Sequence, residues 1–335
     1  MYLGAESCEI NIAGKYTIRG LETFEEKKSV HQIVQTAKLT LPLSYVIRNK
    51  ELIERVKLFD NIKEGDSISI AYGYNGKNDN FFTGYIKRIN VKQPLELELE
   101  DELYLLRKLN LTKSFKKNDV REVVQYVCDE LFKKYNVRLT LYEKMPKLTV
   151  TNFIMNGVNG VSVLQELSDT YGMNSFLITI DGKKTLYCGL AYGLKFNYIN
   201  YIINANTINV DDLQFKGGET ESYKVKFIVH APSGIVTKKE FGNKLGDSLT
   251  DVHLYGSFTE KEIELQAEAH LAAYKTGGYK GSFDTLLTPK VQHCDIAVVR
   301  DLQFENRKGN YYIATVTNTF GTAGGKRKVE IDFII

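Results

Sequence analysis

The first hundred residues alternate between apolar and polar positions with a period of two, which is typical of β-strands with one buried face. The alternation is unbroken at 95–100, where three leucines share one face and three glutamates share the other. The dipeptide Asn75-Gly76 favours a hairpin turn. Several short strands separated by turns predict a barrel or a sandwich, with strands at 7–12, 16–26, 36–43, 67–72, 81–86 and 95–100.

Beyond residue 110 the period changes to that of an α-helix. Apolar residues recur at helical spacing after Asp119, which stands in the N-cap position, and Asn136 follows the last turn. A second helix is expected at 161–171 and is closed by Gly172. It leads into two strands joined by Asp181-Gly182. These elements predict a small α+β unit, placed at 106–192.

Strand patterns return at 207–215 and 223–230, and a third helix follows them. Thr259 and Glu262 form a capping box at its start, and Gly277-Gly278 ends it. The rest of the chain is again strand-like, at 294–299, 311–316 and 328–333. The apolar stripe of the third helix consists of Ile263, Ala267, His270, Leu271 and Tyr274.

Two distant stretches share one pattern, in which an aspartate opens a strand, a polar hairpin follows, and an aromatic pair opens the return strand. The first stretch begins at Asp66 and returns at Phe81, and the second begins at Asp295 and returns at Tyr311. A true repeat would mean two versions of one β-barrel and quasi-symmetry in an assembly. Period-two patterns are common, so chance similarity is the alternative.

Composition narrows the class of function. The 335 residues carry 44 Lys and Arg against 41 Asp and Glu, which leaves a net charge of +3 without the concentrated basic surface of a nucleic-acid-binding protein. No apolar run approaches the length of a membrane span, and the N-terminus lacks a secretory signal pattern. The length favours roughly two to four compact units.

Residues that would carry catalysis or bind a metal show no pattern. The four cysteines lie 60 or more residues apart, and the five histidines share no ligand spacing. The sequence motifs of nucleophile elbows, HExxH metalloproteases and phosphate-binding loops do not occur. We therefore expect no catalytic residue, no cofactor and no metal site.

The C-terminal third resembles phage tail proteins of the late control protein D type, the baseplate hub family of phages and related contractile injection systems. The resemblance lies in 287–299, in the strand at 311–318 and in the Gly324-Gly325 turn. Earlier in the chain, the strands around Asp66 and the small α+β unit occur in the same order as in that family. It spans nearly the whole chain. One departure is Gln292-His293-Cys294 before Asp295, where the family commonly has Pro-Gly.

The resemblance implies a β-rich α+β fold. Two tube-like antiparallel β-barrel domains would be separated by the small α+β domain, and a helical insertion would interrupt the second barrel. The implied division is 1–105 for the first barrel, 106–192 for the α+β domain, 193–240 with 281–335 for the second barrel, and 241–280 for the insertion.

The same resemblance implies a structural protein and not an enzyme. Hubs of this family form homotrimeric rings with pseudo-sixfold symmetry, which join a hexameric tail tube protein to a trimeric spike protein. Such a subunit would be a component of a virion tail or baseplate, encoded by a phage or prophage and made in the bacterial host cytoplasm. The residues expected to shape its barrels are Gly65, Asp66 and Gly84 in the first, and Asp295, Gly324 and Gly325 in the second.

The row formed by Glu96, Glu98 and Glu100 has two interpretations. It is either the solvated outer face of a strand or a lining of the ring lumen. In the lumen, like charge would keep DNA or a tape-measure protein from adhering.

Two other classes of function remain as alternatives. A tail-associated cell-wall hydrolase would need two carboxylates about 5–10 Å apart across a cleft, and the sequence singles out no such pair. A β-rich adhesin or connector module would bind a host surface or another tail component.

Overall fold

The computed structural model describes residues 5–49, 52–190, 193–216, 223–231, 233–243, 246–248, 251–255, 258–273 and 278–334. Within these ranges the protein is β-rich and has three α-helices, of which none is long and apolar enough to cross a membrane. Tyr274 and Gly277, which the sequence assigned to the third helix and its end, lie outside the described residues.

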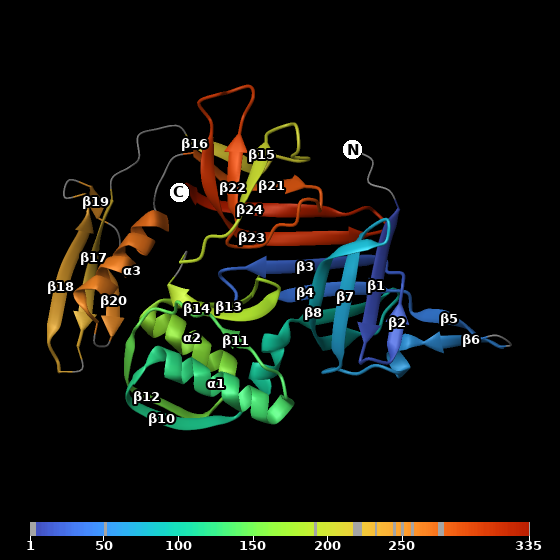
Figure 1. Ribbon diagram of the computed structural model, residues 1–335, viewed down its shortest axis with the longest axis horizontal. Coiled ribbons are helices and arrows are strands. Elements are labelled where there is room, and N and C mark those ends of the chain that lie inside the picture. The colour runs from blue at the N-terminus through green and yellow to red at the C-terminus, as the bar shows by residue number, and fades with distance from the viewer. Residues whose placement is uncertain are drawn as a thin grey trace.

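One large, mostly antiparallel sheet forms the body of the molecule (Figure 1). Eleven of its strands follow one another in a single path, β22 pairs with β23, and β15 pairs with β22 in parallel. Along the path the strands are β16 (Leu213–Lys216), β21 (Gly278–Thr285), β24 (Lys326–Ile334), β23 (Gly309–Gly321), β3 (Thr23–Ser29), β4 (Thr36–Leu41), β9 (Leu95–Glu100), β8 (Lys77–Asn90), β7 (Ser67–Tyr74), β1 (Glu6–Ile12) and β2 (Tyr16–Ile18); beside it lie β22 (Ile296–Arg300) and β15 (Tyr198–Ile202).

The two ends of the chain meet in this sheet, because β3 pairs with β23 in a register that runs from Thr23 opposite Gly321 to Ser29 opposite Thr315. The sequence predicted two separate barrels. The structure instead joins both sets of strands into one path, whose terminal strands β16 and β2 are not paired with each other among the described residues. Period-two alternation fixes the buried face of a strand but not its partner, so this long-range pairing was not predictable.

Two smaller features flank the first half of the sheet. The hairpin of β5 (Ser44–Asn49) and β6 (Leu52–Lys57) extends away from the body at the right of Figure 1. Two 3-10 segments, η1 (Leu58–Asp60) and η2 (Glu102–Lys108), follow β6 and β9. The predicted strand at 16–26 is interrupted, since β2 ends at Ile18 and β3 begins at Thr23.

The expected small α+β unit is present below the sheet in Figure 1, and its two helices confirm the periodicity. Asp119 accepts a hydrogen bond from the Arg121 amide at 2.8 Å, and Asn136 and Gly172 end the helices in left-handed conformations. The unit comprises β10 (Leu111–Asp119), α1 (Val120–Tyr135), β11 (Thr140–Leu141), β12 (Thr149–Val158), α2 (Gly160–Tyr171), β13 (Met173–Ile180) and β14 (Lys183–Leu190).

A third part has its own sheet and core. In it β17 pairs with three strands, and Ile263 and Ala267 of α3 pack against Val225 and Phe227 of β17. The predicted strand at 223–230 therefore forms, but it pairs outside the large sheet, and of 207–215 only the last residues are strand. The elements are β17 (Tyr223–His230), β18 (Val236–Gly242), β19 (Asp247–Ser248), β20 (Val252–Tyr255) and α3 (Glu260–Ala273).

Candidate functional site

The two aspartates of the sequence repeat stand in the same turn. Oδ2 of Asp66 accepts a hydrogen bond from the amide of Lys63 at 2.9 Å. Oδ2 of Asp295 accepts one from the amide of Gln292, also at 2.9 Å. In each case the side chain holds the residue three positions earlier and so fixes the entry into the following strand.

The residue before each aspartate has a left-handed backbone. Gly65 has φ of 90° and Cys294 has φ of 71°. The Gly65 amide donates to the carbonyl of Ile86 at 2.7 Å, and the Cys294 amide donates to that of Ile313 at 2.9 Å. The two turns therefore share one conformation, with Cys294 in the position where glycine is favoured.

The strands after the two turns also pair in one register. Ser67 lies opposite Tyr85 in β7 and β8, and Ile296 lies opposite Tyr312 in β22 and β23. This register makes Gly84 the equivalent of Tyr311. The sequence comparison had matched Phe81 with Tyr311, which is three residues out of step, because it followed the aromatic pairs and not the hydrogen bonds.

Gly84, Gly324 and Gly325 lie where a side chain is excluded or strained. A Cβ atom on Gly84 would come within 2.0 Å of the backbone oxygen of Glu100. Gly324 has φ of 99°, and a Cβ atom on Gly325 would meet the hydroxyl of Tyr74 at 2.5 Å. The last contact lies between a turn near the C-terminus and a strand of the first half.

The glutamate row is neutralised by neighbouring cations. Glu96 pairs with Lys38 at 2.8 Å and with Lys92 at 2.9 Å, and these contacts lower the pKa of Glu96 to about 2. The Glu100 side chain is almost fully buried and pairs with Lys87 and Arg107. Glu98, the most exposed of the three, lies 3.9 Å from Arg88. The row is thus covered by paired cations toward Glu100, and only Glu98 is substantially exposed.

A buried polar cluster joins the two halves of the large sheet. Arg327 of β24 is fully buried and donates to Oδ1 of Asn318 at 2.7 Å and to Oδ1 of Asn80 at 3.2 Å. Asn318 in turn donates to Oε1 of Glu26 at 2.7 Å, as does the hydroxyl of Tyr72. The cluster links β23 and β24 of the C-terminal half to β3, β7 and β8 of the N-terminal half.

Charge in this cluster is compensated. Burial opposes ionisation of Glu26, but Lys28, at 2.9 Å, and the hydrogen bonds from Tyr72 and Asn318 outweigh it and lower the pKa of Glu26. Arg327 also donates to the backbone oxygen of Pro289. The carboxylate and the guanidinium are therefore held through a shared asparagine and not by direct contact.

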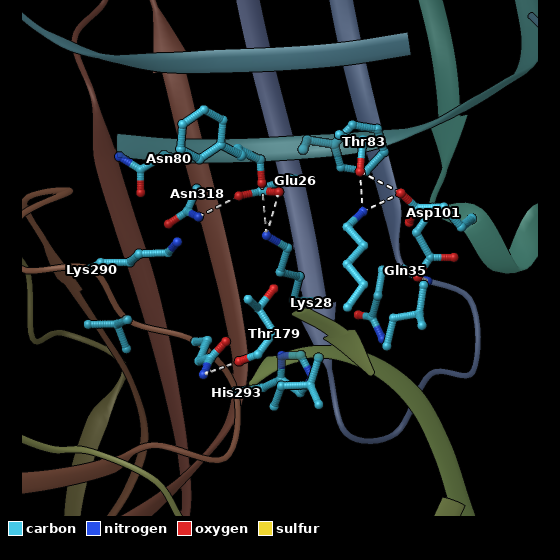
Figure 2. A pocket seen from close by; sticks show the side chains of 18 of the residues that line it. Glu26, Lys28, Gln35, Asn80, Thr83, Asp101, Thr179, Lys290, His293 and Asn318 are labelled. Carbon is cyan, nitrogen blue, oxygen red and sulfur yellow. Dashed lines mark hydrogen bonds and ion pairs between the residues drawn. The ribbon is translucent and has the colours of Figure 1, made fainter. Parts of the chain in front are cut away.

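A cavity of about 410 Å³ lies beside the cluster, between the large sheet and the β13–β14 hairpin of the α+β unit (Figure 2). The hairpin is tied to the sheet because Lys184 contacts both Thr83 and Glu102. A second tie runs from the side chain of Gln292 to the backbone oxygen of Thr179 at 3.3 Å.

Three of the four cysteines are buried in apolar surroundings. Burial raises the pKa of Cys188 to about 11 and that of Cys128 and Cys294 to about 12, so these cysteines remain thiols. In the part of the chain that is described, no three His, Cys, Asp or Glu side chains are arranged to hold a metal ion.

The sequence analysis did not single out Glu26, Arg327 or the cavity. A signal was present, however, because Arg327 is in phase with Val329 and Ile331, and Glu26 is in phase with Phe24. A charged residue on the apolar face of a strand implies a buried partner. What the sequence did not contain was the identity of that partner, which lies in a strand almost 300 residues away.

Comparison with known proteins indicates which class of fold this chain has. No protein-family model and no curated protein matches the sequence. Solved structures do match. A tail protein from Neisseria meningitidis superposes with a TM-score of 0.66 at 11% identity, over 98% of this chain and 96% of that one.

Two further structures agree. The 43 kDa tail protein of prophage MuSo2 from Shewanella oneidensis gives a TM-score of 0.61 at 12% identity, over 97% of each chain. A component of the type VI secretion system from E. coli gives 0.59 at 9% identity, over 97% of this chain and 76% of that one. The chain therefore has the fold of phage and prophage tail proteins along nearly its whole length, and at these identities the likeness concerns the fold alone.

Proposed function

We propose that this chain is the hub subunit of a phage tail or a contractile injection system. Three copies would form a ring with pseudo-sixfold symmetry, with a hexameric tail tube protein on one side and a trimeric spike protein on the other. The protein would act in the tail or baseplate of a virion or a related machine. Its task would be mechanical and not catalytic.

The observation that carries this proposal is the turn shared by Asp66 and Asp295, with the same backbone bonds and the same strand register after it. Two equivalent strand pairs in one subunit give three subunits six similar modules. A sixfold tube can then dock on a threefold ring without a change of its own symmetry.

The ends of the large sheet offer the surfaces for assembly. Strands β2 and β16 each have a neighbour on one side only, so their outer backbone groups are free of ladder partners among the described strands. Pairing of these edges between subunits would close the ring and cover edges that otherwise favour aggregation. The barrels expected from the sequence would then be completed by the assembly.

The domain division is part of the proposal, with one change. We keep the first barrel at 1–105 and the α+β domain at 106–192. The insertion, placed at 241–280 from the sequence, would begin near residue 217, because β17 pairs with β18, β19 and β20 and packs on α3. The second barrel would then consist of 193–216 and 278–335.

Of the row of Glu96, Glu98 and Glu100, the first two would form the lumen surface, because Glu100 is buried inside the subunit. Lys38 and Arg88, which pair with Glu96 and Glu98, would give the lumen a mixed charge, which suits passage of DNA or a tape-measure protein without strong attraction. Lumen placement requires these side chains to face the ring axis.

The mass in solution tests the proposal. Light scattering over a concentration series should give a species near three times 38.1 kDa, with a larger share of it at high concentration. A chain that stays monomeric at every concentration, also in the presence of its spike protein, would contradict a trimeric hub.

A further inference from the structure

The cavity beside the buried polar cluster has three properties of a binding site. Its volume of about 410 Å³ falls within the range of roughly 300–1,000 Å³ that is usual for ligand pockets. Its walls come from distant parts of the chain, namely β3, β8, the β13–β14 hairpin and the segment 290–293. Apolar surface from Phe81, Leu177 and Ile178 lies next to charged groups in its lining.

Polar atoms in this lining are left without partners. His293 is 1% exposed, and neither of its ring nitrogens makes a hydrogen bond of normal geometry. Oε2 of Glu102 is also buried and makes none. Buried polar atoms are almost always hydrogen-bonded in native proteins, so these two side chains indicate a missing partner.

The histidine is neutral in this position. Burial, together with the charge of Lys28, lowers the pKa of His293 to about 3, and proximity to the Leu177 carbonyl only partly opposes this shift. A neutral imidazole offers one N–H donor and one acceptor. The donor suits an anionic oxygen.

Two of the three lysines that line the cavity pair with a carboxylate. Lys28 is paired with Glu26, and Lys184 is paired with Glu102. Asp101 accepts hydrogen bonds from the backbone amides of Gln35 and Leu103.

Lys290 has no carboxylate within ion-pair distance in the described part of the chain. Its Nζ atom lies 6.0 Å from the ring centre of Phe81. Figure 2 shows Lys28 and Lys290 on one side of Thr179 and His293 on the other.

We infer that this cavity binds the C-terminal segment of a peptide, with its carboxylate on the side of Lys290 and His293, a backbone N–H at Glu102, and an apolar side chain against Phe81 and Leu177. A peptide C-terminus supplies both an anion and backbone N–H donors, which matches the two kinds of unpaired atom. The site is separate from the sheet edges and does not depend on ring formation.

Isothermal titration calorimetry of the full chain tests this inference with three probes. Acetyl-Phe-Leu with a free carboxylate should bind, and the same dipeptide with a C-terminal amide should bind at least about 10-fold more weakly, since the charge-assisted hydrogen bond is lost. The third probe, 3-phenylpropionate, has the carboxylate and a ring but lacks the amide N–H. It should also bind more weakly than the peptide acid.

Variants at the rim assign the binding to this cavity. Lys290→Gln should weaken binding of the peptide acid by about 10-fold or more, and Lys290→Arg should retain most of it. Lys117→Gln, an exposed lysine of β10, is the matched control and should have no effect.

Three results would overturn the inference: no binding of the peptide acid, equal binding of the peptide amide, or an unchanged affinity in Lys290→Gln. Equal affinity for 3-phenylpropionate would overturn the assignment to a peptide, because a free small acid would then suffice.

Discussion

At the scale of single residues, the fold depends on a few backbone positions and not on reactive side chains. Gly65 and Cys294 have the left-handed conformation that their turns need, and Gly84 allows β8 to approach the chain at Glu100. A cysteine at the second turn shows that the aspartate after it, together with the strand pairing, suffices to hold the conformation. The left-handed conformation at 294 therefore does not require a glycine.

Gly84→Ala should destabilise the protein by about 3 kcal/mol or more, because the new Cβ atom would meet a backbone oxygen at 2.0 Å and backbone cannot move aside cheaply. Denaturant unfolding of both variants measures the change. The control is Gly20→Ala, where nothing lies within 4 Å of the new atom and the effect should stay within about 0.5 kcal/mol. Equal stability of the two variants would show that β8 and Glu100 are not packed in this way.

At the scale of elements, the junction of β3 and β23 is the central feature, and the buried cluster around Arg327 specifies it. Hydrophobic contacts tolerate small shifts of one strand against another, but a buried arginine has only one arrangement that satisfies its donors. The cluster therefore favours one register between the two halves.

Arg327→Met should lower the free energy of unfolding by about 3–5 kcal/mol, since Glu26 and Asn318 would remain buried with an incomplete set of partners. Because Asn318 couples the two charges, the double variant Glu26→Gln/Arg327→Met should lose less stability than the sum of the single variants.

A surface control separates this effect from loss of any arginine. Arg19→Met breaks an exposed ion pair with Glu9 and should cost less than about 1 kcal/mol. Strictly additive changes at Glu26 and Arg327, or a cost at Arg327 as small as at Arg19, would show that the cluster does not hold the junction.

Some elements could be predicted from local sequence signals, and others could not. Local signals sufficed for α1 and α2, whose caps at Asp119, Asn136 and Gly172 are formed as expected, and for the strand at 95–100. Pairing between β3 and β23, and the parallel pairing of β15 with β22, depend on contacts between residues far apart in sequence. No local pattern encodes such a choice of partner, so the open single sheet and the separate sheet of β17 appeared only in the structure.

The features of the candidate site also differ in how far the sequence could predict them. The turns at Asp66 and Asp295 were visible as short motifs because each is a local structure. The buried cluster and the cavity combine side chains from strands at both ends of the chain, and only the inward phase of Glu26 and Arg327 marked them in advance. The correct register of the repeat, with Ile86 equivalent to Ile313, required the backbone hydrogen bonds.

At the scale of the whole molecule, the account joins three features. The fold is that of phage and prophage tail proteins. The large sheet contains two strand pairs with the same turn and register, and its terminal strands β2 and β16 each have one unpaired edge among the strands that the structure describes. A subunit of this kind suits a ring in which edges pair between neighbours and six similar modules surround an axis.

Electron microscopy of the assembled particle tests this central claim most directly. The account predicts a ring of three chains in which the turns at Asp66 and Asp295 alternate around the axis, so that low-resolution averages show six similar lobes. A particle without a ring, or a threefold particle in which the two turns lie at unrelated radii and heights, would contradict it.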